Sequence, residues 1–531
     1  MSAPSSARRW LGLIVIALGV ALIVVDSTIV NVIVPSVIED LGIDSVQAQW
    51  IQESYAVVLA ALLLLAGRAA DIVGARRIFI AGVVVFGATS VLAGLAPTGG
   101  LLVLARFLQG AGAAMILPTS LSLLNATFTG KARGQAFAVW GSTIGAASAI
   151  GPLLGGWLAE HASWRWAFGI NVPLTVLICA GALAFLAPSP RTRGRIDLAG
   201  AALSALGLGL LAFGLVEGRA YGWLATTRPL TVLGFSWDGG PSPVLIAFVL
   251  AAAALIAFVR RQAAVSRGGD TSRALMDLRL FSVASFRNGN ITTLIIGLGE
   301  FGIIAVLPLW MQFTLGYSAL QAGLALLPLA VGSFVASGAG FGLKVTALGQ
   351  VRVGLALEAA GLTLLALVAA TDSPWWPIAL ALFLYGVGVG FATAQVTNVV
   401  LADIPHHSAG QGSGIQSAFR QLGSALGIAV LTTVFFTTLS SSLHQRLTAS
   451  DVPAAQSETL TRTVTDSAGA AITAVSADPR TVVVADAARA AMTEGVAVSG
   501  YLAAGLLLLG LIATTRIPAP AAPSPREPVR L

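Results

Sequence analysis

Charged residues are scarce in this chain: only 10% of its 531 residues are Asp, Glu, Lys or Arg, against about 25% in ordinary globular proteins. Hydrophobic residues make up 56% of the chain, and the mean hydropathy is +0.87. This composition excludes a water-soluble fold. Apolar stretches of about 20 residues recur from end to end, and each is long enough to cross about 30 Å of hydrocarbon as a helix. We therefore expect an all-α polytopic membrane protein.

Cysteine is nearly absent as well. Cys179 is the single cysteine, and it lies inside an apolar run. One cysteine cannot form a disulfide framework or a thiolate metal cluster within one chain. The adjacent His406 and His407 have no third ligand nearby in the sequence, so we expect no metal site.

Nucleotide-binding motifs are missing too. Gly386, Gly388 and Gly390 have the spacing of a dinucleotide loop, but they lie in an apolar helical stretch and follow no strand. No Walker loop is present in the sequence. We therefore expect no enzymatic activity, no cofactor and no ATP-driven step.

The apolar runs predict fourteen membrane-spanning helices. The first run is too long for the core of a signal peptide and lacks a convincing cleavage site, so we assign it as the first span. The predicted spans are 10–34, 48–66, 78–96, 101–126, 134–158, 167–187, 196–216, 243–259, 288–312, 319–341, 351–371, 375–402, 410–438 and 492–515.

The basic residues indicate the orientation. With a cytoplasmic N-terminus, the inside segments hold 21 Lys and Arg residues and the outside segments hold seven. Because positive charge accumulates in cytoplasmic loops, both termini are predicted to be cytoplasmic. The basic residues form short clusters and no continuous face, so the net charge of +7 indicates topology and not a nucleic-acid partner. Arg outnumbers Lys 28 to 2, a bias typical of GC-rich bacteria.

Three stretches in the first half combine charges with small residues. The loop after the second predicted span contains Gly67, Arg68, Asp71, Gly74, Arg76 and Arg77. Its glycines permit a tight turn, and its charges can pair with each other or with helix ends. The fourth predicted span opens with Arg106, and Gln109 follows one turn later.

The fifth predicted span carries a stripe of small residues. Gly141, Gly145, Ser148, Pro152 and Gly156 follow at spacings of 4, 3, 4 and 4, which puts them on one face of a helix. Such stripes let helix backbones approach closely inside a membrane. We assign Gly151 and Gly155 to the same packing motif.

These stretches resemble the cytoplasmic loop motif, the fourth-helix Arg motif and the fifth-helix antiporter motif of the major facilitator superfamily. Asp26 with Ser27 and Thr28 in the first span, and the segment from Trp164 to Pro173, add to the resemblance. With fourteen spans, the chain is similar to the drug:proton antiporter branch, which inserts two helices between its six-helix halves. The loop motif departs from the family at Ala75, and its second-half echo, from Gly342 to Arg352, is badly degraded.

The resemblance implies two six-helix bundles plus two accessory helices, working by alternating access around a midplane cavity. The implied segments are an N-terminal bundle (1–190), two accessory helices with a cytoplasmic linker (191–286), a C-terminal bundle (287–516) with a long external loop (439–491), and a disordered tail (517–531). The long loop either folds over the outer mouth or serves as a flexible spacer.

Five charged residues within the predicted spans are candidates for proton coupling or cargo binding: Asp26, Glu53, Arg106, Glu300 and Glu358. A charge at the centre of a span costs about 2.5–3.5 kcal/mol, so such a residue usually faces a cavity or a partner. Asp26 and Arg106 lie at a similar depth and can pair. Glu53 lies near the outer interface and can equally be hydrated there. For Glu358, a packing contact with another helix and a role in transport are equally good explanations. For Glu300, no basic residue of its own helix can pair with it, which favours a position facing a cavity.

Four other residues are interpreted as structural or interfacial. Arg420 and Gly423 lie on the small, polar side of the thirteenth predicted span, and together with Gln109 we interpret them as helix packing beside the cytoplasmic gate. Direct cargo contact by Arg420 is the alternative. Glu217, next to Arg219 at a helix end, is interpreted as an interfacial residue.

These features predict a proton-driven antiporter that exports small amphiphilic, often cationic, drugs or toxic compounds across the bacterial cytoplasmic membrane. The expected partners are the cargo, protons and the bilayer, and we expect a monomer. Two alternatives use the same machinery: a dedicated exporter of one endogenous metabolite, antibiotic or lipid, and a proton symporter for uptake.

Overall fold

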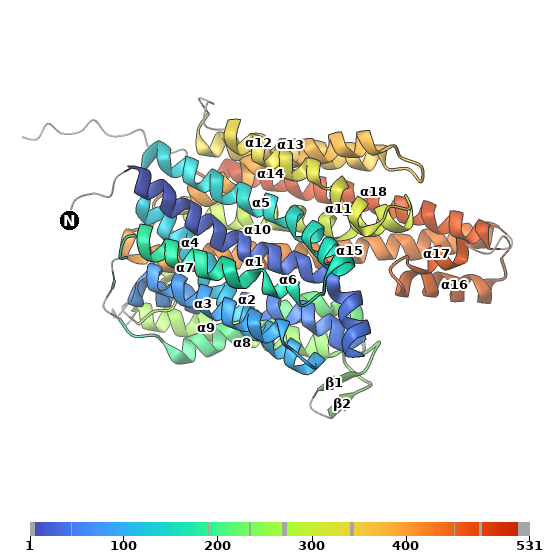
Figure 1. Cartoon of the computed structure of the whole chain (residues 1–531), viewed down its shortest axis with the longest axis horizontal. Coiled ribbons are helices and arrows are strands. Elements are labelled where there is room, and N and C mark those ends of the chain that lie inside the picture. The colour runs from blue at the N-terminus through green and yellow to red at the C-terminus, as the bar shows by residue number, and fades with distance from the viewer. Residues whose placement is uncertain are drawn as a thin grey trace, which may run out of the picture.

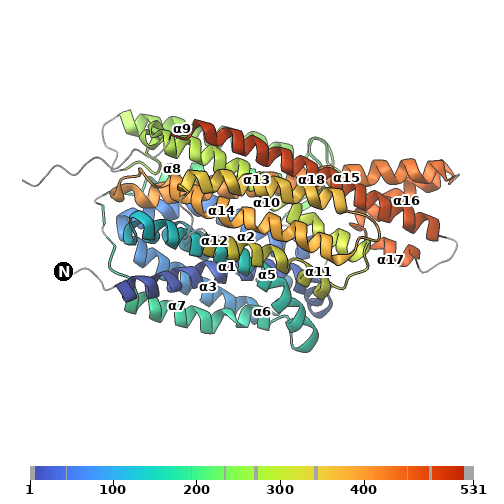
Figure 2. The same cartoon turned by 90° about the horizontal axis from the view of Figure 1, so that it is seen from above.

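Long helices lie side by side along one axis and make up most of the described chain (Figures 1 and 2). The structure is a computed structural model that describes residues 6–518 except 44, 190, 193, 233–234, 268–272, 340–344, 451 and 477–480. Most of the predicted tail (517–531) and Gly342 therefore lie outside the described residues. We call the end of the bundle at which the described chain begins the terminal end, and the opposite one the far end.

The elements of the first half are α1 (Ser6–Leu41), α2 (Ser45–Val73), α3 (Ala75–Gly94), α4 (Gly99–Thr127), α5 (Gly130–His161), α6 (Trp166–Gly169), α7 (Asn171–Phe185), α8 (Leu198–Tyr221), β1 (Leu230–Val232), β2 (Phe235–Trp237) and α9 (Pro243–Arg267). Those of the second half are η1 (Leu278–Ser282), α10 (Ala284–Phe313), α11 (Ala319–Ala325), α12 (Leu327–Ala339), α13 (Ala347–Val368), α14 (Trp375–Val400), η2 (His406–Ser408), α15 (Ala409–Ala449), α16 (Ala454–Asp466), α17 (Ala471–Ser476), α18 (Val482–Ala513) and η3 (Thr514–Arg516). Apolar segments take this form because a helix satisfies its own backbone polar groups where water is absent.

Thirteen helices in the described chain are long and apolar enough to cross a membrane. The remaining predicted span, the tenth at 319–341, is interrupted and consists of α11 and α12, which meet at Leu326. Pro328 follows directly, and a proline lacks the N–H that an uninterrupted helix needs at this point. The all-α membrane fold is confirmed, with one span broken in two.

The predicted external loop, 439–491, is largely helical in its described part. Helix α15 has 41 residues and is about 60 Å long, twice the thickness of the hydrocarbon core. It continues into an extension at the far end, formed with α16, α17 and the start of α18 (Figure 1). Leu443, Leu447, Val464 and Ile472 are buried there, so apolar packing stabilises the extension. A flexible spacer was therefore the wrong alternative.

The two accessory helices, α8 and α9, pack against each other, and α8 also contacts α2 and α15. Asp197 caps the start of α8, and Arg261 of α9 donates three hydrogen bonds to its carboxylate at 2.7–2.9 Å. Burial opposes ionisation of Asp197, but the bonds from Arg261, Gly200 and Gln262 outweigh it and lower the pKa of this carboxyl.

A short hairpin of β1 and β2, which the sequence did not predict, joins these helices at the far end (Figure 1).

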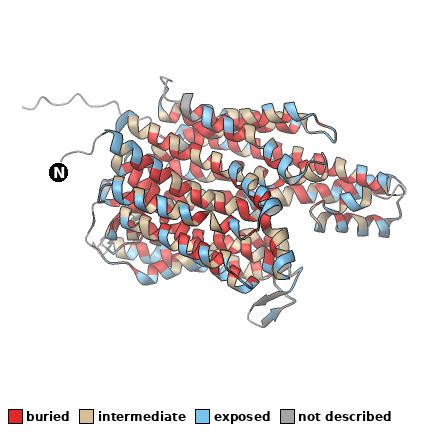
Figure 3. Ribbon diagram, viewed as in Figure 1, coloured by how far each residue is buried: buried red, intermediate tan, exposed pale blue. Residues whose placement is uncertain are grey.

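Large apolar side chains lie on the outside of the bundle as well as in its core. Val176 and Leu183 are more than 60% exposed, whereas charged side chains such as Asp26 and Glu358 are buried. Figure 3 shows buried residues throughout the interior of the bundle. This pattern suits a protein whose outer surface faces lipid. The two halves meet where α15 packs on α2 and where α5 packs on α12 and α14. The segment boundaries at 190, 286 and 516 stay a prediction.

Candidate functional site

A closed polar cluster lies inside the first half, and we call it the Asp26 cluster. Arg106 of α4 forms an ion pair with Asp26 of α1, as the sequence predicted, and both side chains are at most 1% exposed. Gln109 and Asn171 donate to the other carboxylate oxygen of Asp26 at 3.0 and 2.7 Å, and both also donate to Ser90 of α3. Four helices therefore converge on one carboxylate.

The guanidinium of Arg106 is held on its other sides too. Its Nε donates to the backbone oxygen of Ile51 at 3.0 Å, and its Nη1 donates to Gln109 at 2.8 Å. The guanidinium lies 4.5 Å from the centre of the Tyr55 ring. The pair is thus neutral as a unit and well hydrogen-bonded, which is the condition under which a buried ion pair is tolerated.

A second buried group, the Glu300 cluster, lies in the other half and comprises Glu300 (α10), Glu358 (α13), Thr393 (α14) and Arg420 (α15). Thr393 donates to the Glu300 carboxylate, and the Arg420 guanidinium attracts both carboxyls. Glu358 is fully buried, and no residue in the described chain donates a hydrogen bond to either of its carboxyl oxygens. The cluster holds two carboxyls for one guanidinium, so its charges balance only when one carboxyl carries a proton.

Arg420 also reaches the boundary between the halves. Its guanidinium lies 5.7 Å from the ring centre of Trp140 on α5 and 5.8 Å from that of Phe301 on α10. These distances are within the range of cation–π attraction. Arg420 therefore lies between the acidic pair of one half and an aromatic ring of the other.

Glu53 of α2 forms a hydrogen bond with Glu217 of α8. Glu217 is 1% exposed, so it is buried inside the bundle, while its interpretation as a residue at interfacial depth stays a prediction. The sequence placed it near a helix end, but the packing of α8 on α2 covers it. Two carboxyls can share a hydrogen bond only when one of them is protonated, since ionised carboxylates accept but do not donate.

The loop motif joins the two halves at the terminal end. The Asp71 carboxylate accepts hydrogen bonds from the backbone N–H groups of Gly410 at 2.7 Å and Gln411 at 2.8 Å, the first residues of α15. We call this contact the latch. A carboxylate is stabilised at a helix N-terminus by the helix dipole and by the N–H groups exposed there.

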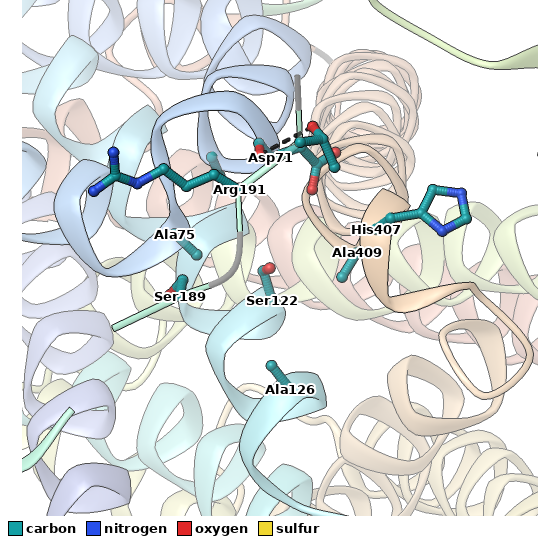
Figure 4. A pocket seen from close by; sticks show the side chains of 10 residues that line it. Asp71, Ala75, Ser122, Ala126, Ser189, Arg191, His407 and Ala409 are labelled. Atoms are coloured by element: carbon teal, nitrogen blue, oxygen red, sulfur yellow. Dashed lines mark hydrogen bonds between the residues drawn. The ribbon is translucent and has the colours of Figure 1, made fainter. Parts of the chain in front are cut away.

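A cavity of about 330 Å³ lies beside the latch, lined by Ser122, Ser189, Arg191, His407 and other residues. Arg191 and His407 point away from each other on its opposite sides (Figure 4). Thr192 donates to the backbone oxygen of Asp71 at 2.8 Å, so the segment after α7 also holds the latch in place.

Other residues of the loop motif let the helices approach. Gly74 joins α2 to α3 with a φ of +104°, a conformation that only glycine adopts readily. A Cβ atom on Gly67 would lie 2.5 Å from the backbone oxygen of Gly410, so α2 and α15 require glycine there. Arg76 donates to the backbone oxygens of Ala182 and Leu183 at the end of α7, where a positive charge is favourable. Arg68 is attracted by Asp71, and Arg77 is exposed.

The sequence profile of the Major Facilitator Superfamily matches residues 16–428. The chain belongs to this superfamily. Among curated proteins, it is 36% identical to the puromycin resistance protein pur8 of Streptomyces alboniger, over 80% of this chain and 82% of that protein. It is 33% identical to a probable actinorhodin transporter of Streptomyces coelicolor (82% and 74% covered) and 30% identical to the multidrug resistance protein Stp of Mycobacterium tuberculosis H37Rv (87% and 82% covered).

Solved structures of the superfamily have the same fold. The human organic anion transporter MFSD10 aligns with a TM-score of 0.59 at 14% identity, covering 95% of this chain and 99% of that one. The proton:xylose symporter XylE aligns with a TM-score of 0.56 at 14% identity, covering 89% and 96%. The protein is thus a multi-pass membrane protein with the Major Facilitator fold.

The packing motif of this superfamily member serves two separate contacts and not one stripe. A Cβ atom on Gly151 would overlap Thr28 of α1, and one on Gly155 would lie 3.0 Å from the backbone oxygen of Ile29. Gly145 instead faces Ser333 of α12, in the other half. A Cβ atom on Gly156 would meet no described atom within 4 Å, so its inclusion in the stripe was wrong. Pro152 lies close to Gly323 of α11, and Gly141 is buried.

The interpretation of Gln109 and Arg420 as gate packing is corrected, because both belong to buried charge clusters. Arg420 is ten residues, or about 15 Å of helix, from the latch at Gly410. Gly423 does act in packing, because a Cβ atom there would overlap the backbone of Leu294 on α10. Ser90 and Thr393 were missed, since serine and threonine are common in membrane helices and neither lies in a distinctive pattern. The roles of the five charged candidates in transport stay predictions.

The Trp164 and Arg165 segment has a structural contact at the far end. Arg165 and Trp164 donate hydrogen bonds to Asp40 in the last turn of α1. These bonds, with that of Arg165 the stronger, hold the pKa of Asp40 below its usual value.

Proposed function

We propose that this protein is a proton-coupled antiporter that exports small amphiphilic, often cationic, drugs or toxic compounds across the bacterial cytoplasmic membrane, with both termini in the cytoplasm. The resistance and export proteins of Streptomyces and Mycobacterium to which it is similar support export as the direction. The relatives do not bear on proton coupling, which rests on the buried carboxyls.

The observation that carries the proposal is the charge balance of the Glu300 cluster. Glu300 and Glu358 are buried and share one guanidinium, that of Arg420. Like charges in a dry interior disfavour simultaneous ionisation, so the neutral cluster binds one proton. Loss of that proton leaves one negative charge, which a cationic cargo can compensate, and it strengthens the attraction of Arg420 to both carboxyls.

Helix α15 connects this proton site to the latch. It carries Arg420, and its first residues, Gly410 and Gln411, bind Asp71. Because a continuous helix transmits displacement along its axis, a shift of Arg420 on proton binding or release also moves the helix end that Asp71 holds. The proton site thereby controls opening at the terminal end, which is the cytoplasmic end on the predicted topology.

The energy of one proton is enough for a neutral cargo. Moving one charge through a potential of ~150 mV yields about 3.5 kcal/mol, which sustains a cargo gradient of a few hundredfold. A cationic cargo moves against the same potential and therefore needs a pH difference or a second proton. The hydrogen-bonded carboxyls of Glu53 and Glu217 are suited to carry that second proton.

A dedicated exporter of one antibiotic or metabolite is the second candidate. Several relatives are named for a single compound, among them the probable actinorhodin transporter and a tetracenomycin C resistance and export protein. Such an exporter would use the same proton site and differ in its cargo contacts.

Transport by purified protein in sealed vesicles tests both candidates. An imposed pH gradient is expected to drive uptake of several fluorescent cations and of puromycin into vesicles containing inside-out protein, with proton release that follows cargo addition. Glu300→Gln is expected to abolish both fluxes. Glu494→Gln, a half-exposed carboxyl paired with Arg446 in the extension, is the matched control. Equal cargo flux with and without the pH gradient would contradict proton coupling, and transport of one compound only would favour the dedicated exporter.

A further inference from the structure

A cavity of about 880 Å³ opens at the far end of the molecule, between the accessory helices and the extension. Its lining comes from α8, the segment before β1, α15 and α16, and includes Val216, Arg219, Ala220, Arg228, Arg462 and Asp466. Its volume is within the usual range for small-molecule sites. Neither the proton sites nor the latch uses this cavity.

The charges around the cavity are mainly positive, since three arginines and one aspartate line it. Arg462 donates a hydrogen bond to Glu458 at 2.6 Å, so its charge is partly compensated. Arg219 and Arg228 lie close enough to repel each other, and neither donates a hydrogen bond to a residue in the described part of the chain. Two neighbouring guanidinium groups therefore present donors that suit an oxygen-rich anion.

Arg219 is held in a defined orientation. Its guanidinium lies 3.3 Å from the centre of the Phe436 ring on α15. Stacking occupies the face of a guanidinium and leaves the N–H groups in its plane available for an acceptor. Attraction to Asp466 adds a second constraint from α16. The extension, which the sequence did not predict to be helical, thus completes the wall around Arg219.

The cavity also lies beside the last turn of α8, a helix long and apolar enough to span a membrane. Arg219 is two residues from the end of α8, and Val216 and Ala220 on the same helix provide an apolar side. An amphiphile whose head group carries negative oxygens would place that group at the arginines and its apolar part along α8. Arginine binds phosphate and carboxylate alike through two parallel hydrogen bonds. A phosphate group offers three acceptor oxygens, so it can accept from both neighbouring guanidinium groups at once.

We propose that this cavity binds a phosphate-bearing anion at the outer face, through Arg219 and Arg228. The phosphate belongs either to the head group of an anionic phospholipid or to a soluble phosphate compound. The site is independent of the proposed export activity, because none of its residues belongs to the Asp26 cluster, the Glu300 cluster or the Glu53–Glu217 pair.

The test measures ligand binding on the full chain in neutral detergent. One arm counts phosphatidylglycerol molecules retained in native mass spectrometry, with phosphatidylcholine as the neutral comparison, and the other follows thermal stabilisation by glycerol 1-phosphate and inorganic phosphate. Arg219→Gln with Arg228→Gln is expected to weaken binding at least about tenfold, the effect of losing one charge-assisted hydrogen bond. Arg446→Gln, a salt-bridged arginine in the same extension, is the control and keeps wild-type binding.

The two arms distinguish the sources of the phosphate. Arginine-dependent retention of phosphatidylglycerol alone identifies a lipid, and arginine-dependent stabilisation by the soluble phosphates identifies a soluble anion. Binding by the wild type is also expected to weaken as salt is added, which needs no variant. Equal retention of the neutral lipid, or binding that is unchanged in the double variant, would overturn the proposal.

Discussion

The two halves of the molecule bury acidic groups in opposite ways. In the first half, Asp26 is matched by Arg106 and accepts further hydrogen bonds from Gln109 and Asn171. In the second half, Glu300 and Glu358 share the single charge of Arg420, and the Glu358 carboxyl accepts no hydrogen bond in the described chain. The first cluster is satisfied without a mobile ion, whereas the second requires one.

The two clusters differ in how their charges are matched. In the first cluster each charge has one partner of the opposite sign, and removal of either partner leaves a buried charge uncompensated. An acidic pair with one cation changes its charge whenever a proton or cationic cargo arrives. Buried charge alone therefore does not distinguish the two clusters, whereas the balance of charges within each of them does.

The largest expected effect follows from breaking the matched pair. Asp26→Asn leaves the Arg106 guanidinium uncompensated inside the bundle, and such a loss typically costs about 3–5 kcal/mol of stability. Folded yield and thermal unfolding in detergent measure it. Adding Arg106→Gln to Asp26→Asn is expected to recover part of the loss. If Asp26→Asn alone unfolded at the wild-type temperature, the ion pair of Asp26 with Arg106 would not stabilise the fold.

Glu358→Gln tests the opposite half. The neutral amide replaces a carboxyl that has no hydrogen-bond donor in the described structure, so stability is expected to stay the same or rise. Cargo uptake driven by a pH gradient is expected to fall at least about tenfold, equivalent to 1.4 kcal/mol or more. If Glu358→Gln destabilised the protein as much as Asp26→Asn and left transport intact, the contrast between the halves would be reversed.

Helix α5 packs against α1, which carries Asp26. Two glycines of α5 provide a test variant and its control. A Cβ atom on Gly151 would overlap Thr28, next to Asp26 on α1, whereas one on Gly156 would meet no described atom within 4 Å. Gly151→Ala is expected to cost about 1–3 kcal/mol by overpacking. Gly156→Ala is expected to change stability by less than about 0.5 kcal/mol. Equal unfolding temperatures for the two variants would refute the close contact between α1 and α5.

The latch is a charged contact that joins the two halves at the terminal end. Asp71→Asn removes the negative charge at the start of α15, an interaction of about 0.3–2 kcal/mol, so the terminal end should open more often. Labelling of Ser122→Cys in the cavity beside the latch, in a Cys179→Ser background, reports this opening. The labelling rate is expected to rise by about two- to thirtyfold. Arg77→Gln, an exposed residue of the same loop, should leave it unchanged.

The most selective effect, confined to cationic cargos, is expected at the second acidic pair. Glu53→Gln and Glu217→Gln each replace one carboxyl with an amide that keeps a hydrogen bond, so neutral cargos should be transported as before. The accumulation of cationic cargos should fall about tenfold, because the variant protein no longer carries the second proton. Accumulation of matched neutral and cationic dyes decides this. Equal losses for both classes would make the pair structural.

Much of the architecture could be predicted because it depends on local properties of the chain. Apolar runs of sufficient length predict the spans, and the spacing of Gly67, Asp71 and Gly74 predicts a tight, charged turn between two helices. The pairing of Asp26 with Arg106 was also within reach, because both lie at one depth on helices of opposite direction. These features follow from hydropathy, chain direction and turn geometry.

Other features depended on which helix faces which, and only the tertiary structure decided them. The sequence did not indicate that Glu217 has a partner, whereas the packing of α8 against α2 buries it on Glu53. Arg420 was assigned to the gate, although helix rotation turns it toward Glu300 and Glu358. The loop 439–491 proved largely helical because Val464 and Ile472 find apolar partners on distant segments. The sequence by itself determined how often the chain crosses the membrane and which charges it carries inside, whereas contacts between helices far apart in the sequence decided which charges are matched and which share one partner.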